Sequence, residues 1–166
     1  MTERAASLLT DADVKVSRSA GMHGQAAVLT SGDPVKFVLR DGVIVWLTSP
    51  DLPSWMPDAV HDLEQLSILG HNWDSYRARP ILPDNIVTAL EVLLTLVKKD
   101  TPRPYVVPTV IGGVQLEWHT LRADLEIEVV APLRLHVLWE PEEGSSCEIE
   151  VVSDFVHLRE WVAQIS

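Results

Sequence analysis

Residues 114–129 read VQLEWHTLRADLEIEV, and apolar and polar side chains alternate through both ends of this stretch. Successive side chains of a β-strand point to opposite faces of a sheet, so this period of two predicts two strands that share one apolar face. The same alternation returns in residues 133–139 and 147–151. We therefore predict an antiparallel sheet of about four strands, with one face on a core and the other turned to solvent.

Three segments around these strands carry apolar residues at helical spacing, namely residues 58–69, 84–98 and 154–165. Gly70 is predicted to end the first helix, and Asp84 to cap the second. Helices of this kind bury their apolar stripe against another element, here the apolar face of the sheet. The fold class predicted for residues 57–166 is therefore α+β, with the helices on one face of the sheet.

Residues 1–50 form a separate N-terminal appendage that we predict to be a small β-meander. Its strongest signal is Asp41-Gly42 between two β-rich runs. This dipeptide favours a two-residue hairpin turn, which would place Phe37 opposite Trp46.

The charge balance restricts the partners of the chain. Its 166 residues include 24 acidic and 13 basic ones, for a net charge of −11. Phosphate binding needs clustered Lys and Arg, so nucleic acid and an anionic membrane surface are disfavoured as partners. A basic protein or a cation remains compatible with this charge.

Cys147 is the only cysteine, which excludes a disulfide within the chain and a cysteine-based zinc site. It alternates into the predicted apolar face, so we expect a buried, unreactive thiol. The chain carries neither an apolar leader after Met1 nor a run long enough to span a bilayer. These features together favour a cytoplasmic localisation.

The polar face of the predicted sheet is acidic, and matching the apolar faces proposes how its residues pair. Leu116 opposite Ile127, followed by a three-residue loop at 130–132, sets the register. Two rows across the strands result, one reading Glu117, Glu126, His136, Glu148 and the other reading Gln115, Glu128, Arg134, Glu150. Like charges directly opposite each other destabilise a sheet, so we expect something to compensate for these carboxylates.

Three interpretations of this face are open. It could be a solvated surface, eased by Arg134 and His136 and screened by salt. It could bind a basic protein segment. It could also hold a divalent metal through the row Glu117, Glu126, His136 and Glu148, whose ligand types suit Mn, Fe or Zn.

The function predicted from these features is a non-enzymatic protein-binding module of the antitoxin, immunity or regulatory-partner type. The alternative is a metal-dependent enzyme, such as a hydrolase, with its site on the same face. No catalytic or cofactor-binding motif is found, so no cofactor and no catalytic residue are assigned. The predicted partner-binding residues are Glu117, Glu126, Glu128, Glu148 and Glu150 on the sheet, with Trp73 and Asp74 from the loop before residue 84.

Several short motifs resemble those of a family of small uncharacterised bacterial proteins. They are Asn72-Trp73-Asp74-Ser75-Tyr76 with Ala78 and Pro80, Pro108-Thr109 with Gly112-Gly113, Gln115-Leu116-Glu117-Trp118, and Leu125-Glu126-Ile127-Glu128. The resemblance covers about residues 63–130 and departs from the family at Ser75 and Arg77, where glycine is usual. It singles out Glu117, Glu126 and Glu128, but it implies no activity, since none is established for that family.

Overall fold

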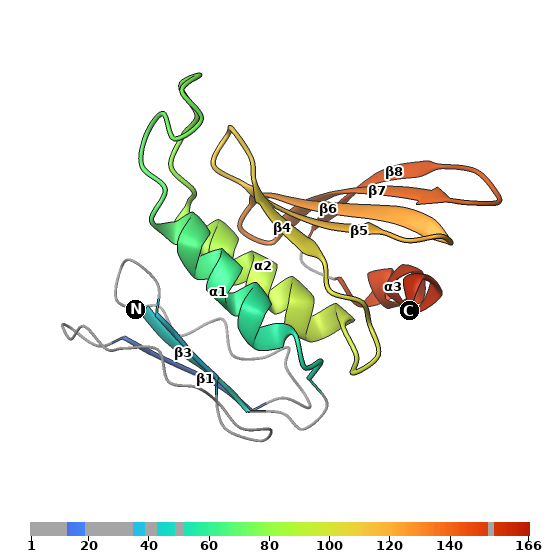
Figure 1. The fold of residues 1–166 in the computed structure, drawn as a ribbon, viewed down its shortest axis with the longest axis horizontal. Coiled ribbons are helices and arrows are strands. Elements are labelled where there is room, and N and C mark those ends of the chain that lie inside the picture. The colour runs from blue at the N-terminus through green and yellow to red at the C-terminus, as the bar shows by residue number, and fades with distance from the viewer. Residues whose placement is uncertain (1–12, 19–34, 39–42, 49–51, 153–154) are drawn as a thin grey trace.

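The elements of the chain lie in three layers (Figure 1). We describe it from a computed structural model, which covers residues 13–18, 35–38, 43–48, 52–152 and 155–166, the first three segments by their backbone alone. Helices α1 and α2 lie between a five-stranded sheet and a three-stranded sheet.

The five-stranded sheet is antiparallel throughout and has the strand order β4-β5-β6-β7-β8. Its strands are β4 Tyr105–Pro108, β5 Val114–His119, β6 Ala123–Ala131, β7 Arg134–Pro141 and β8 Cys147–Val152. The predicted α+β class with helices on an antiparallel sheet is confirmed. The sheet has one strand more than the four indicated by alternation, because β4 also belongs to it.

The sequence does not predict strand β4, because Pro104 and Pro108 argue against a strand there. The Thr109 N–H donates to the Gly113 carbonyl at 3.0 Å, which fixes the phase of the ladder between β4 and β5. In an antiparallel pair, backbone groups that face the neighbour recur at every second residue. The ring nitrogens of Pro104 and Pro108 therefore point away from β5, and neither proline removes a ladder hydrogen bond. Such positions on an edge strand are where proline is tolerated.

The helices lie close to the predicted segments, with bounds that differ by about a turn or less. They are α1 Met56–Ser67, α2 Pro83–Leu96, the 3-10 turn η1 Val156–Leu158 and α3 Arg159–Ile165. The last predicted helix is thus split into η1 and α3, and residues 153–154 lie outside the described residues.

Both helix-end assignments from the sequence are wrong in detail. Helix α1 ends at Ser67 with Ile68 as its C-cap, so Gly70 lies beyond its end. The N-cap residue of α2 is Leu82, and Asp84 lies in the first turn instead. Pro83 explains the shift, because its fixed φ and missing N–H suit the first turn of a helix.

The core fills the space between the five-stranded sheet and the helices. Inward side chains of β5 to β7 are almost completely buried, as in Leu116, Ile127 and Val137, and they pack with Leu63 and Leu93 from the helices. Trp118 is 1% exposed. Its indole N–H is still satisfied, since it donates to the Pro102 carbonyl at 2.8 Å. Trp139 stacks on Trp161 with ring centroids 5.7 Å apart.

The N-terminal sheet is built from β1 Asp13–Arg18, β2 Val35–Val38 and β3 Val43–Thr48 in the order β1-β3-β2. A simple meander would place β2 in the centre, so that detail of the prediction is wrong. Phe37 lies opposite Val45 rather than Trp46, a slip of one residue, and the predicted turn at residues 41–42 lies outside the described residues. Strand β2 lies beside α1, so this sheet flanks the helices on the side away from the five-stranded sheet (Figure 1).

Candidate partner-binding face

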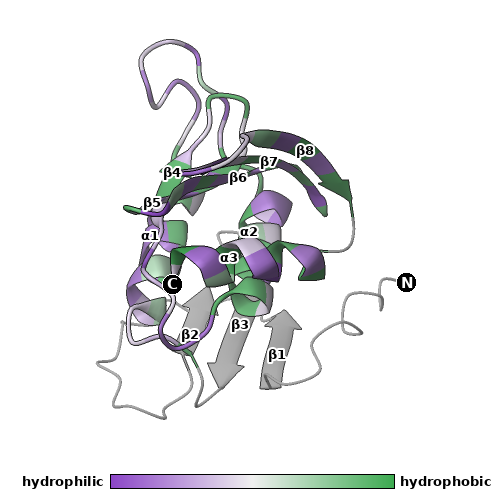
Figure 2. Ribbon diagram, turned by 90° about the vertical axis from the view of Figure 1, so that its right-hand side faces the viewer, coloured by the Kyte–Doolittle hydropathy of each residue, from purple (hydrophilic) through white to green (hydrophobic). Residues whose placement is uncertain are grey.

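One face of the five-stranded sheet is left bare by the other elements that the structure describes. In two perpendicular views, all described helices lie on the other side of this sheet (Figures 1 and 2). Alternation along β5 to β8 directs Glu117, Glu126, Glu128, Glu148 and Glu150 to the bare side, and none of the five is buried. We call this surface the acidic face.

Strands β5 and β6 pair as the sequence predicts. Leu116 lies opposite Ile127, Glu117 opposite Glu126, and Gln115 opposite Glu128. The backbone groups of Glu117 point toward β4, so Glu117 and Glu126 form a non-hydrogen-bonded pair, in which facing side chains come closest. Gln115 relieves part of the repulsion, because its amide Nε2 donates to Glu126 Oε2 at 2.9 Å.

The predicted pairing of β7 is wrong by two residues on both sides. Glu128 lies opposite His136, and Glu126 lies opposite Leu138. His136 in turn lies opposite Glu150. The turn between β6 and β7 contains Pro132 and Leu133, and the register shifts between Val129 and Ala131, so the loop is not the three-residue loop that we expected.

The corrected rows on the acidic face are Glu117–Glu126–Leu138–Glu148 and Gln115–Glu128–His136–Glu150. A neutral leucine therefore stands where the first row was predicted to hold a histidine. Leu138 is half-buried among these polar side chains.

Arg134 and His136 of β7 contact the glutamates of β8 diagonally. The Arg134 guanidinium donates to both carboxylate oxygens of Glu150, at 3.0 and 2.9 Å. This pair lowers the pKa of Glu150 and raises the pKa of Arg134. His136 Nε2 lies 2.8 Å from Glu148 Oε1. All four side chains are about half exposed, so these ion pairs contribute little to stability.

His119 joins two carboxylates at the far end of β5. Its Nδ1 lies 3.0 Å from Asp124 Oδ1, and its Nε2 lies 3.3 Å from Glu117 Oε2. The hydrogen bond with Asp124, and then that with Glu117, raise the pKa of His119. The Tyr105 ring lies beside it, with ring centroids 6.2 Å apart.

The acidic face holds more carboxylates than its cations can neutralise. The outward positions of β5 to β8 include Asp124 and Glu140, which lie directly opposite each other and which the sequence interpretation did not include. The only arginine or lysine at these outward positions is Arg134. The face therefore keeps a negative charge even with His119 and His136 protonated.

The predicted metal ligands do not come together as a set. His136 contacts Glu148, but Leu138 separates Glu148 from Glu126 in the row that holds Glu117. Across the residues that the structure describes, no group of three or more His, Cys, Asp and Glu side chains is arranged to hold a metal ion. The quartet inferred from the predicted register is therefore wrong as a coordination set.

Trp73 and Asp74 lie on the loop between α1 and α2 and not on the strands that carry the acidic face. The Trp73 indole N–H donates to the Arg79 carbonyl at 3.0 Å. The Asp74 carboxylate accepts from the backbone N–H groups of Tyr76 and Ala78, at 2.7 and 3.0 Å. The bond from Ala78 is the largest cause of a lowered pKa of Asp74. Both side chains thus hold the loop together.

The two positions that depart from the resembled family have the backbone conformation of glycine. Ser75 has φ 67° and Arg77 has φ 75°, both in the left-handed region. Side chains with a Cβ are strained there, and glycine adopts this conformation most readily. The chain therefore forms this loop with two residues that are poorly suited to it.

The turn between β4 and β5 fits closely against the α1–α2 loop. The Arg79 N–H donates to the Val110 carbonyl, and the Leu82 N–H donates to the Gly112 carbonyl. A Cβ on Gly112 would lie 2.8 Å from the Pro80 carbonyl oxygen, and one on Gly113 would lie 2.6 Å from the Val129 carbonyl oxygen. The paired glycines therefore serve close packing of backbone on backbone.

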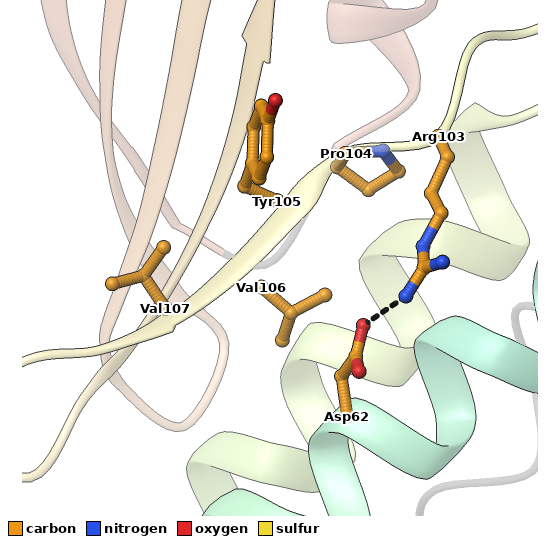
Figure 3. Close-up of a pocket in the computed structure, with 6 residues that line it drawn as sticks. All are labelled: Asp62, Arg103, Pro104, Tyr105, Val106 and Val107. Atoms are coloured by element: carbon orange, nitrogen blue, oxygen red, sulfur yellow. Dashed lines mark hydrogen bonds and ion pairs between the residues drawn. The ribbon is translucent and has the colours of Figure 1, made fainter.

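A cleft of about 530 Å³ lies between α1 and the edge strand β4 (Figure 3). Arg103 reaches down to Asp62 of α1, with Nη2 and Oδ2 2.6 Å apart, while Tyr105 points away from this pair. Arg103 also lies 3.5 Å from Asp58. The charged groups of the cleft are therefore paired with one another, and the rest of the lining is Pro104, Tyr105, Val106 and Val107.

Comparisons of the chain with protein-family models, with curated proteins and with solved structures gave no match. The resemblance to the bacterial family stays a prediction from motifs. Within the described segments, none of the helices has the length and apolar character needed to cross a bilayer.

Proposed function

We propose that this protein is a non-enzymatic binding module of the antitoxin, immunity or regulatory-partner type, whose acidic face docks on a basic protein. The observation that carries the proposal is the bare side of the five-stranded sheet, where an excess of carboxylates surrounds half-buried Leu138. A mixed surface of this kind offers charge for steering and an apolar contact for burial.

The like-charge pairs give this proposal its physical basis. Glu117 faces Glu126, and Asp124 faces Glu140. Each such pair costs a fraction of a kcal/mol in the isolated protein. Lysine or arginine side chains of a partner would relieve this cost on binding, so the repulsion contributes to affinity. A polyanion such as nucleic acid would increase it, and an anionic membrane would do the same.

We also propose a cytoplasmic location, which the lone Cys147 led us to expect. A regulatory partner must share a compartment with its target. The thiol makes no contribution to the proposed binding. Association should weaken as salt concentration rises, since exposed charges are screened over about 8–10 Å at physiological ionic strength.

Affinity capture with two charge-reversed baits tests the proposal. One bait carries Glu126→Lys and Glu128→Lys on the acidic face. The control carries Glu142→Lys and Glu143→Lys in the exposed loop between β7 and β8, and changes the net charge by the same amount. Mass spectrometry should find a basic protein with the wild-type and control baits and not with the face variant. Equal capture by all three baits, each with the wild-type melting temperature, would contradict the proposal.

A further inference from the structure

The two edges of the five-stranded sheet differ in what they offer to another chain. A free edge presents unpaired backbone N–H and C=O groups, on which a further strand can form. In β4 and the residue before it, the backbone nitrogens that point outward are those of residues 104, 106 and 108, and prolines occupy the first and last of these positions. Only the Val106 N–H remains, so this edge cannot support a continuous ladder.

Strand β8 forms the opposite edge and lacks this protection. It is six residues long, contains no proline, and has β7 as its only partner among the strands that the structure describes. The Glu142 N–H donates to the Arg122 carbonyl at 2.7 Å, which fixes the phase of the ladder through β6 and β7. The same alternation continues across β7, so the backbone N–H and C=O groups of Cys147, Ile149 and Val151 point toward β7. The backbone groups of Glu148, Glu150 and Val152 therefore face outward.

The side chains of β8 indicate the pattern that an added strand would need. Glu148 and Glu150 stand on the acidic face with exposed side chains, so neighbouring positions of an added strand favour basic residues. On the other face, Cys147 and Ile149 are only partly buried, whereas Leu135 and Val137 of β7 are fully buried. The expectation of a buried Cys147 is thus wrong. The apolar layer is incomplete at this edge, and apolar residues of an added strand would extend it.

We infer that β8 is the docking edge for an extended partner segment in which basic and apolar residues alternate. The segment would add a sixth strand beside β8, with its basic side chains in the glutamate rows. This rests on the proposed function and states how the basic partner engages the face. A basic strand at the edge also places further cations of the partner beside the acidic face.

A second copy of the chain fits this edge poorly. In antiparallel registers that overlap most of two β8 strands, the outward residues pair among themselves. Glu148 then lies opposite Glu150, or Glu150 lies opposite its own copy. Directly opposed like charges are destabilising. The same glutamates that favour a basic segment therefore disfavour pairing between copies.

The test uses a synthetic peptide of alternating lysine and valine, of the same six-residue length as β8. Its control has the same sequence with N-methyl groups on alternate amides, which block the ladder and keep the side chains. Amide hydrogen exchange of the full chain should slow at Glu148, Glu150 and Val152 and stay unchanged at Val106. The N-methylated peptide should bind about tenfold more weakly.

Two variants separate the backbone contribution from the charge. Val152→Pro removes an outward N–H and keeps the charge, and Glu150→Gln removes a charge and keeps the N–H. Each should weaken binding of the lysine–valine peptide about fivefold.

Equal binding of both peptides, or protection confined to β5 and β6, would overturn the edge inference while leaving the acidic face as a binding surface. Absence of binding by either peptide would also overturn it, and the capture experiment with Glu126 and Glu128 would still decide the proposed function.

Discussion

The two faces of the five-stranded sheet are made by alternate residues of the same strands, and they differ in almost every physical respect. Leu116 and Trp118 point to the core and are buried, while Glu117 between them points to a bare surface. The inner face is fixed by burial of apolar area, which sets the free energy of unfolding. The outer face contributes little burial and contains opposed like charges, so its composition reflects something other than stability.

Truncation of two sequence neighbours on opposite faces should give the largest difference in the free energy of unfolding. Trp118→Ala should lower the free energy of unfolding by about 3–5 kcal/mol, because it opens a large cavity and leaves the Pro102 carbonyl without its donor. Glu117→Ala should change it by about 0.5 kcal/mol or less. Urea denaturation of both variants measures the difference. Similar losses would mean that the acidic face is structurally buried in solution.

The α1–α2 loop belongs to neither face and serves as a reference for stability without binding. Ser75→Gly and Arg77→Gly should each raise the free energy of unfolding by about 0.5–1 kcal/mol, because glycine removes the strain of a positive φ. Thermal melts report the gain. Neither substitution should affect partner capture, and a loss of stability would contradict the left-handed conformation at that position.

Charge repulsion across the acidic face predicts a smaller gain. Glu126→Gln removes the charge opposite Glu117 and keeps an acceptor for Gln115, so stability should rise by about 0.5 kcal/mol. Glu142→Gln in the exposed loop is the matched control and should have no effect. Stability gained at Glu126 together with weaker partner capture would show that the face is optimised for binding. Unchanged stability would mean that the two carboxylates do not repel each other measurably.

The smallest effect is a pH dependence at the edge of the same face. The raised pKa of His119 means that the folded state favours the imidazolium between Asp124 and Glu117. This stabilisation is fully present below the ordinary value near 6.5 and is lost as pH rises through the folded pKa. His119→Gln should therefore reduce the drop in melting temperature between about pH 6 and about pH 8. An identical drop in both proteins would exclude this role for His119.

The sequence predicts well which residues form strands, and less well which residues of neighbouring strands lie opposite each other. Strand β7 shows the reason. Alternation tells which face a residue occupies, and a slip of two residues keeps every residue on its face. The shift that brings Glu128, rather than Glu126, opposite His136 therefore leaves no trace in the pattern. The register of β5 and β6 was predicted correctly, with Leu116 opposite Ile127. The same alternation would also have allowed Leu125 or Val129 opposite Leu116.

Strand β4 shows a second limit of the sequence. Pro104 and Pro108 argue against a strand unless the direction of their nitrogens is known, and that direction follows only from the hydrogen bond between Thr109 and Gly113. Tyr105, which lies beside His119 on the sheet, was missed for the same reason. The strained loop was detectable in principle, because the resemblance placed glycines where Ser75 and Arg77 stand.

Photo-crosslinking from the centre of the acidic face tests the central claim most directly. A photoreactive phenylalanine analogue replaces Leu138, which leaves every carboxylate in place, and a control carries it at exposed Gln65 on α1. The proposal predicts that irradiation in living cells joins position 138, and not position 65, to a basic protein, and that added Glu126→Lys and Glu128→Lys abolish the product. No product from position 138, or the same product from both positions, would contradict it.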